Sequence, residues 1–568
     1  MKISLRYSDM LRGCLGGLLP AFLLFGATDA NAQSAMDAMT LARPDMKGTA
    51  RYMSMGGAFG ALGGDLTTLS MNPAGIGVYR NHEVGVTVSL DAISTSSESG
   101  AGKFSSDKTP FLLDNIGGVL TLRLNSETCP NLNFGFTYNR TASFHNRYGG
   151  SLGNLNTSMT NWMAGVANGE EVTVNDVSYS GTFNPYNPND GGYAAPWMTI
   201  LGYQSYLINP TGNPDAPTWE GQFGSDTYGT ANYSVEETGG IDSFNIAFGG
   251  NFGNLLYWGM DFDISNLNYT RNTFYGENMQ GAYVESNQGI EQTTSNWNLQ
   301  NWYNVSGTGF TYKLGLILRP IQELRIGVAF HTPTYYSLTQ QFSGKVNATY
   351  DGQASYTNYT NADSRGNWEP GYSDFRFVSP WKVMVSAAGV IGGKFIISAD
   401  YQWDLASKMH FKDPSYYYYD YGYDYGINND PLAQNSYYLT NQDISNYYSD
   451  IHTLRVGAEY RVTKNFSIRA GYSNVSSGVK QETKDGRQTI YPAGTNAQYS
   501  FTDATNYYTA GLGYRTGGFY ADLAYVNKQY TSTYHAFPGD PTSSYPVEPT
   551  AKVKYANNQV ILSLGYKF

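Results

Sequence analysis

Apolar and polar residues alternate with period two in many segments of about ten residues along this chain. In the last segment Val560, Leu562, Leu564, Tyr566 and Phe568 alternate with smaller or polar residues, and residues 453–462 and 394–403 repeat the pattern with charges among the alternate positions. Alternation predicts strands with one apolar and one polar face. Because the polar faces carry charges, lipid outside and a hydrated lumen inside fit better than a soluble sandwich, whose inward face would be apolar.

The same pattern recurs along most of the sequence and predicts an all-β protein. Counting these segments predicts a 14-stranded antiparallel transmembrane β-barrel. The expected strands lie near residues 82–93, 113–124, 132–146, 242–253, 255–275, 300–319, 322–343, 372–391, 394–412, 449–463, 465–477, 504–516, 518–533 and 555–568.

Connections between the expected strands alternate in length. Arg319–Gln322, Gly392–Gly393, Thr463–Lys464 and Thr516–Gly518 are tight, whereas the connections between them are long and polar. Short turns are periplasmic and long loops extracellular in barrels of this kind. An even strand count then returns both ends of the barrel to the periplasm, where an amino-terminal extension could enter the lumen.

Composition supports a barrel. The chain has 50 Tyr and 64 Gly, only 14% charged residues and a mean hydropathy of -0.40, and after the first thirty residues it has no apolar run long enough for a membrane-spanning helix. Aromatic girdles and a half-polar strand pattern explain these values. The formal net charge of -11 argues against nucleic acid as a partner.

The first 32 residues have the layout of a cleaved signal peptide. Lys2, Arg6 and Arg12 precede an apolar stretch over 15–27, and Ala30-Asn31-Ala32 then offers a cleavage site before Gln33. We therefore expect export and residence in the outer membrane of a Gram-negative bacterium. Cys129 is then the only thiol of the mature chain, which excludes an intramolecular disulfide.

Residues 33–81 do not alternate like strands and are rich in Met, Leu, Gly and other small residues. Such a segment needs a surface to bury against. Asp65 is placed to cap a short helix over 66–71, which Asn72-Pro73 would end. We expect a partly helical hatch that plugs the lumen, followed by the barrel over 82–568.

The hatch sequence GTARYMSMGGAFGALGGDLTTLSMNPAGIGVYR, from Gly48 to Arg80, resembles the amino-terminal hatch of the FadL/TodX family of outer-membrane transporters. The resemblance implies passive uptake of hydrophobic compounds, with long-chain fatty acids as the leading class, and sideways release into the membrane. It also implies that Asn72, Pro73 and Ala74 form the hatch motif. The expected partners are thus a hydrophobic small molecule and outer-membrane lipid.

A kinked third strand forms the lateral opening in that family, which implies a role for Leu132, Phe134, Gly135 and Phe136 here. The final strand resembles the carboxy-terminal signal that the barrel assembly machinery recognises, with Tyr566 and Phe568 as its aromatic residues. The chain departs from the family in its longest loop, roughly residues 146–240, which follows the third strand instead of the fifth.

Other motifs give no chemistry. Gly149–Gly153 fits G-x-S-x-G, but neither a strand-to-helix elbow nor a nearby histidine is evident, so we expect a small-residue loop and no enzyme. The six histidines lack metal-ligand spacing, and we expect no metal and no cofactor. We expect seven charged side chains to face the lumen, where they pair or stay hydrated. They are Arg455, Glu459, Arg461, Asp400, Asp404, Asp261 and Asp263.

Three alternatives remain open from the sequence. One is a haem or hemin receptor, because relatives of the hatch sequence are sometimes labelled so and a lone histidine can ligate haem. Another is a surface adhesin that the barrel anchors, to which the tyrosine-rich segment Tyr416–Tyr425 could contribute. The third is an open porin for polar solutes, which an apolar plug disfavours.

Overall fold

The computed structural model describes residues 33–180, 183–187, 195–286, 289–351, 354–360, 369–414, 436–492, 494–539 and 548–568. The expected signal peptide and the segment Tyr416–Tyr425 lie outside these residues. Among the described residues, no helix combines the length and the apolar character needed to cross a membrane.

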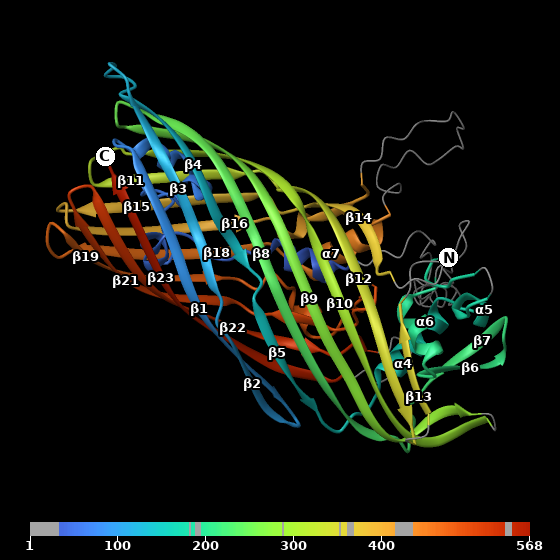
Figure 1. The fold of residues 1–568 in the computed structure, drawn as a ribbon. Coiled ribbons are helices and arrows are strands. Elements are labelled where there is room, and N and C mark those ends of the chain that lie inside the picture. The colour runs from blue at the N-terminus through green and yellow to red at the C-terminus, as the bar shows by residue number, and fades with distance from the viewer. Residues whose placement is uncertain are drawn as a thin grey trace, which may run out of the picture.

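Fourteen strands of the described chain pair in sequence order, each antiparallel to the next, and the last pairs with the first. The predicted strand number and the closed barrel are therefore confirmed (Figure 1). The barrel strands are β1 (Glu83–Ser99), β3 (Phe111–Arg123), β4 (Asn131–Ser143), β8 (Tyr228–Phe252), β9 (Leu256–Ser286), β10 (Gly289–Leu318), β11 (Leu324–His331), β15 (Lys382–Ile391), β16 (Phe395–Asp404), β18 (Ile451–Arg461), β19 (Phe466–Val475), β21 (Thr505–Thr516), β22 (Phe519–His535) and β23 (Thr550–Lys567).

Short turns gather at one end of the barrel, beside the carboxy-terminus, and the long connections gather at the other (Figure 1). The predicted tight turns are all at this short-turn end. Gly392 and Gly393 both have positive φ, 58° and 66°, which a two-residue hairpin turn requires and which glycine adopts without strain.

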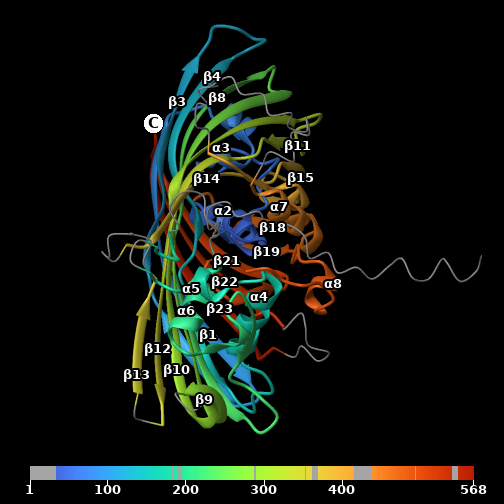
Figure 2. The same ribbon diagram turned by 90° about the vertical axis from the view of Figure 1, so that its right-hand side faces the viewer.

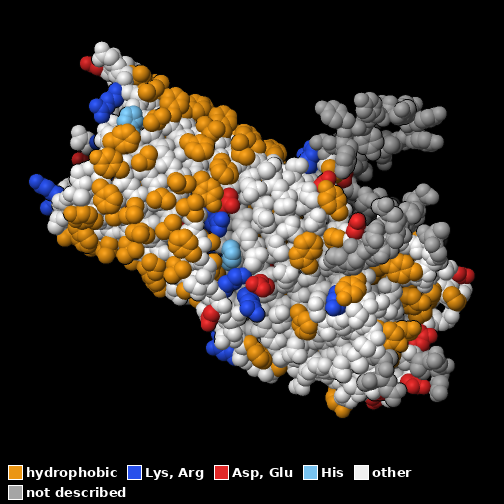
Figure 3. Space-filling model, in the orientation of Figure 1, with side chains coloured by type: hydrophobic (Ala, Val, Ile, Leu, Met, Phe, Trp, Pro, Cys, Tyr) orange, Lys and Arg blue, Asp and Glu red, His pale blue; other side chains and the backbone are white. Residues whose placement is uncertain are grey.

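Outward side chains of the short-turn half form an apolar band around the barrel (Figure 3). The final strand is typical: Val560 and Leu562 are 49% and 40% exposed, while Ile561 between them is fully buried. The predicted assignment of lipid-facing and inward residues is thus confirmed for this strand. A band of exposed apolar side chains on a closed barrel is the surface that lipid covers.

Three expected strands are interrupted. Pro333 separates β11 from β12 (Tyr335–Tyr350), and Pro380 separates β14 (Gly371–Val378) from β15. Proline has no N–H for the ladder, so each strand breaks there; β11 and β12 both pair with β10, while on their other side β11 pairs with β15 and β12 with β14. The third, residues 394–412, divides into β16, the short helix η3 (Ala406–Lys408) and β17 (His410–Lys412).

Several strands continue far beyond the apolar band at the long-loop end, where further elements join them (Figures 1 and 2). The expected long loop over 146–240 is largely folded, and its helices pack on these extensions. The added elements are β2 (Gly102–Lys108), β5 (Asn146–Leu152), α4 (Met159–Gly169), α5 (Val174–Val177), α6 (Trp197–Gln204), β6 (Ile208–Asn213), β7 (Ala216–Gly221), β13 (Ala354–Tyr359), α7 (Tyr438–Tyr447), α8 (Gln481–Lys484) and β20 (Tyr499–Thr502).

Residues 33–81 occupy the barrel interior as the sequence analysis expects (Figure 2). They form α1 (Ala35–Ala42), α2 (Ala50–Ser54), α3 (Thr68–Met71) and the 3-10 helix η1 (Pro73–Val78). We call residues 33–45, near the long-loop end, the upper plug, and residues 46–78 the lower plug. The apolar side chains of both parts are buried or partly buried against the barrel and its extensions, so the segment has the packing surface that its composition requires.

Candidate functional site: the plug and the luminal pocket

Asp65 stabilises a turn in the middle of the lower plug. Its carboxylate accepts hydrogen bonds from Thr67 N–H (3.0 Å) and Thr49 Oγ1 (2.7 Å). Asp65 therefore stabilises the turn before the helix, and α3 is shorter than the sequence predicts because it begins at Thr68. Asn72 and Pro73 end α3 and start η1, as expected for a proline at a first helical position.

The hatch motif Asn72-Pro73-Ala74 is buried inside the barrel. Asn72 Nδ2 donates to the Gly60 carbonyl oxygen (2.6 Å), and Asn72 Oδ1 accepts from Ala74 N–H (3.1 Å). A Cβ atom on Gly315 would lie 2.0 Å from Asn72 Oδ1, so the motif lies directly on β10. The motif therefore packs on the sixth barrel strand and not on the third, to which the resemblance assigns the lateral opening, and Asn72 satisfies the plug's own backbone.

The third barrel strand, β4, contacts a different part of the lower plug. Gly135 faces inward, and a Cβ atom there would lie 2.2 Å from Leu69 Cδ2. Phe134 and Phe136 face outward in the apolar band, 48% and 58% exposed. Leu132 to Phe136 pair continuously with β3 and β8, so these residues form an intact wall.

The wall is interrupted higher on the same strand. Pairing between β3 and β4 ends at Asn115 and Asn139, whereas β4 continues to Ser143 with β8 as its only paired neighbour. Residues 111–114 of β3 pair only with β1, and both flanking ladders shift register nearby. We call the facing unpaired segments, residues 111–114 and 140–143, the wall interruption.

Ionic side chains of the plug lie next to the wall interruption. Lys47 Nζ lies 2.8 Å from Asp91 and 3.8 Å from Asp114, all three side chains being buried. Asp45 accepts a long hydrogen bond from Ser143 N–H (3.4 Å) and pairs with Lys528 (2.7 Å). Burial alone would raise the pKa of the Asp45 carboxyl, but Lys528 and Lys47 outweigh it and hold that pKa below its usual value.

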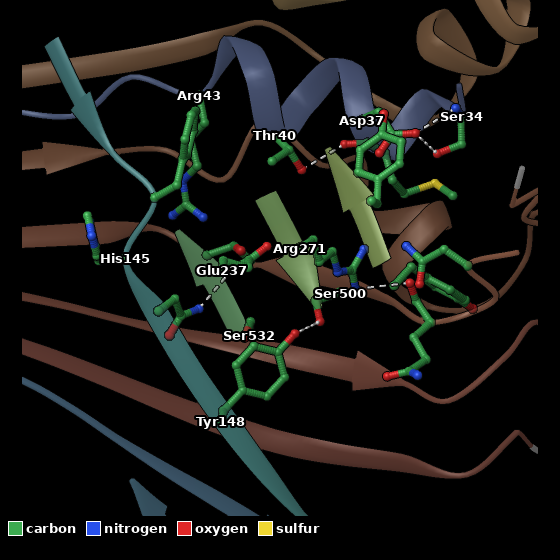
Figure 4. Close-up of a pocket in the computed structure, with 18 of the residues that line it drawn as sticks. Ser34, Asp37, Thr40, Arg43, His145, Tyr148, Glu237, Arg271, Ser500 and Ser532 are labelled. Carbon is green, nitrogen blue, oxygen red and sulfur yellow. Dashed lines mark hydrogen bonds between the residues drawn. The ribbon is translucent and has the colours of Figure 1, made fainter. Parts of the chain in front are cut away.

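A pocket of about 170 Å³ lies between the upper plug and the barrel wall (Figure 4). At the start of α1, Ser34 N–H and Oγ both donate to the Asp37 carboxylate, each at 2.8 Å, which stabilises the first turn of the helix beside the pocket. The wall of the pocket includes residues 142–146, which span the end of β4. The pocket therefore borders the wall interruption.

Two guanidinium groups line the pocket, together with Lys528 and the carboxylates of Asp37, Asp45 and Glu237. Arg43 lies over the Tyr530 ring at 4.8 Å and donates to Thr505 Oγ1 (2.6 Å), and Arg271 donates to the Gln498 carbonyl oxygen (3.1 Å). Within the described chain neither makes an ion pair, and Figure 4 shows both reaching the space below α1. Sequence reasoning missed both residues, because they come from the plug and from β9 and only the fold brings them together.

The expected lumen charges are buried, with one exception. Glu459 pairs with Arg51 (3.1 Å) and Arg469 (2.7 Å), and Asp400 accepts from Phe59 and Gly60 N–H, both at 2.9 Å. These groups hold the plug instead of lining open water. The prediction was wrong for Arg461, which is exposed at the short-turn end of β18.

The remaining sequence motifs lie outside the pocket or carry no chemistry in it. Gly149–Gly153 lies mostly in β5, where Ser151 hydrogen-bonds Asn232, so the expectation of a loop is wrong. His145 borders the pocket and contacts Ser143 Oγ (3.1 Å). The described residues contain no cluster of side chains that could hold a metal ion.

The carboxy-terminal residues lie at the seam of the barrel. Phe568 and His82 exchange two backbone hydrogen bonds of 3.1 Å each, and Tyr566 is 50% exposed at the edge of the apolar band. Recognition of Tyr566 and Phe568 by the assembly machinery stays a prediction.

The sequence matches no family profile and no curated protein. Solved structures do resemble the fold. A FadL homologue of Pseudomonas aeruginosa is 12% identical with a TM-score of 0.49 and covers 93% of this chain and 100% of its own. The toluene transporter TodX of Pseudomonas putida (12%, 0.45) covers 92% and 99%, and the toluene transporter TbuX of Ralstonia pickettii (14%, 0.39) covers 92% and 99%.

At these identities and TM-scores, the barrel assignment depends on the strand pairing described above. The structures named here are a FadL homologue and two toluene transporters, and this chain resembles each of them, in fold alone, over more than nine-tenths of its length.

Proposed function

We propose that this protein lies in the bacterial outer membrane and takes up hydrophobic compounds that carry an acidic head, with long-chain fatty acids as the leading class. The short-turn end is then periplasmic and the long-loop end extracellular. The compound enters the luminal pocket and leaves sideways through the wall interruption.

The observation that carries the proposal is the position of the pocket. It borders the place where β3 and β4 stop pairing, and the lower plug closes the lumen beneath it. A compound in the pocket therefore has the wall interruption beside it and packed protein below it. This arrangement favours a lateral route over passage through the barrel axis.

The two guanidinium groups of the pocket, which make no ion pair in the described chain, support an acidic head group. Arg43 and Arg271 are fork-shaped donors that suit a carboxylate. At about 170 Å³ the pocket is smaller than the roughly 300 Å³ of a drug-sized site, so it would hold one end of a long molecule.

A binding experiment tests the head-group preference. Oleate and oleyl alcohol are titrated into the purified protein and into the variant Arg43→Gln/Arg271→Gln. We expect the variant to bind oleate about tenfold more weakly or worse, because two charge-assisted contacts are lost, and to bind the alcohol as the wild type does. Lys464→Gln, in a short turn, is the matched control. Equal loss for both ligands would contradict recognition of the carboxylate.

A cross-linking experiment tests the route. Leu113→Cys and Thr141→Cys would face each other if β3 and β4 continued to pair, so a disulfide there closes the wall interruption; Cys129, the free cysteine of the described chain, is first replaced by Ser. Uptake of oleate by cells should fall severalfold and recover with dithiothreitol. The control pair, Leu120→Cys with Phe134→Cys, lies in the intact ladder and should leave uptake unchanged.

A haem receptor is an alternative outcome of the same titration, with hemin as the probe and His145→Ala as the variant.

Deleting residues 153–227 of the long-loop end tests whether the protein is an adhesin instead of a transporter. Retained oleate uptake by that variant excludes a role confined to the surface elements.

A further inference from the structure

The outer face of the extended strands changes character beyond the apolar band. On β9, β10 and β12 the apolar band ends at Ile264, Phe310 and Tyr335. The next outward positions are amides and hydroxyls, and the face in Figure 3 becomes nearly free of apolar and charged groups there. These polar positions are Asn266, Asn268, Asn304, Ser306, Thr308, Ser337 and Thr339.

A groove of about 480 Å³ lies on this outer face. Its side chains form two adjacent rows that cross the strands at right angles to their direction. The first row runs through Arg147, Glu236, Asn272, Trp302 and Ser343, and the second through Ser234, Phe274, Gln300, Lys345 and Tyr359.

Rings and amides alternate in the middle of the groove. Trp302 pairs with Asn272 on the neighbouring strand, and Phe274 pairs with Gln300, so each ring has an amide beside it and the other ring diagonally opposite. Both rings are partly buried, and Tyr359, at the edge, lies under Lys345 Nζ at 5.2 Å. Flat apolar rings next to groups that both donate and accept hydrogen bonds suit a sugar, which presents a C–H face and a rim of hydroxyls.

The ends of the groove carry net positive charge. Glu236 is neutralised by Lys108 at 2.8 Å. Arg147 and Lys345 make no ion pair with any residue of the described chain. They are therefore available to a phosphate or carboxylate on a bound saccharide.

The height of the groove above the apolar band indicates where the saccharide comes from. Eight to ten residues separate Phe310 from Trp302 and Ile264 from Phe274, which is roughly 20–25 Å above the apolar band for strands tilted about 40°. The same strand faces lead without a break from the lipid-facing band to the groove. At that height the face meets the sugar layer of the surrounding outer leaflet.

We infer that the groove around Phe274 and Trp302 binds the acidic saccharide head of the glycolipid that surrounds the barrel. The inference depends on the outer-membrane location in the proposed function, but not on transport. The groove shares Asn301 and Trp302 with the lining of the pocket inside the barrel, whereas Phe274, Arg147 and Lys345 line the groove and not the pocket.

Calorimetric titration of the full mature chain in detergent tests the inference. The probes are intact lipopolysaccharide and the same molecule freed of its acyl chains. Phe274→Ala/Trp302→Ala should weaken binding of both probes about tenfold, because two stacking surfaces are lost. Tyr228→Ala, which removes an exposed ring of β8 outside the groove, should leave binding unchanged. Heat-modifiable migration checks that each variant is folded.

A second variant tests the charges. Arg147→Gln/Lys345→Gln should weaken binding of the acyl-free oligosaccharide severalfold and leave binding of its dephosphorylated form unchanged. The inference is overturned if the wild type does not bind the acyl-free oligosaccharide, if the ring variant binds it equally well, or if a neutral glucose polymer binds as tightly.

Uptake distinguishes this inference from the proposed function. The single variant Phe274→Ala, whose ring lines the groove and not the pocket, should take up oleate like the wild type. If the wild type takes up no hydrophobic compound but binds the oligosaccharide, the proposed transport function is wrong and the saccharide site in the groove is still supported.

Discussion

The two parts of the plug are held in different ways. The lower plug is fixed by buried ion pairs and by wall glycines against which its backbone lies, as at Gly315. The upper plug lines a pocket: Asp45, at its end, pairs with Lys528, but Arg43 beside the pocket makes only a hydrogen bond and a ring contact. The comparison indicates a fixed floor beneath a binding site that is less tightly held.

The largest expected effect is on the stability of the lower plug. Glu459 lies between the buried guanidinium groups of Arg51 and Arg469. Removing one partner of such a cluster leaves uncompensated charge at a cost of about 3–5 kcal/mol. We expect Glu459→Gln to loosen the lower plug, seen as faster hydrogen exchange over residues 50–60 and higher conductance in planar bilayers. Glu236→Gln breaks the partly exposed pair with Lys108 and should cost less than about 1 kcal/mol. Equal exchange in both variants would contradict the comparison.

Gly315→Val is expected to have a smaller effect at the hatch motif. Its Cβ would overlap Asn72 Oδ1, and overpacking costs about 1–3 kcal/mol. Thermal unfolding should show lower stability. Gly389→Ala, whose Cβ would have ordinary contacts of 3.4 Å or more, is the control, and a similar loss there would mean that the wall, not the plug, sets the effect.

Replacing Asn72 and Pro73 together should lower oleate uptake with barrel assembly intact. The Gly60 carbonyl loses its donor, a cost of about 1–3 kcal/mol for a buried acceptor. Uptake and heat-modifiable migration are measured on the same cells. Normal uptake by the double variant would remove the motif from the mechanism.

The smallest effect on stability is expected in the upper plug. Arg43→Gln loses its contact with Tyr530, which is about 0.5–1 kcal/mol at a site of this kind. Denaturation should therefore change little while oleate affinity falls. A loss of stability as large as that of Glu459→Gln would show that both parts of the plug are equally structural.

Strand number, closure and the outward faces could be predicted because period-two alternation is local and is repeated along each strand. The expected strands stop at residue 275 and start again at 300, whereas β9 continues to Ser286 and β10 begins at Gly289, because amides and hydroxyls replace the outward apolar residues there. The helices over 159–204 were missed because they are short and pack on those extensions.

The site was predictable only in part. The plug segment could be recognised from its Met, Leu and Gly content and from its resemblance to known hatches. The neighbours of Asn72 and the pairing of Arg271 depend on which strands face the plug, and alternation carries no information on that. The break in pairing at residues 140–143 also leaves no mark in the alternation, because β4 keeps its pattern against β8.

The seam between β1 and β23 carries an additional consequence for biogenesis. Ser563, on the last strand, accepts the Ala50 N–H from the plug (2.7 Å) and contacts Thr87 on the first (2.6 Å), while Asp91 of β1 meets Lys47. The seam is therefore formed by β1, β23 and the plug together, and each of the three leaves polar groups unsatisfied without the other two. Ring closure and plug insertion should occur as one cooperative event, so removing the plug would give a low yield of closed barrels instead of a population of open pores.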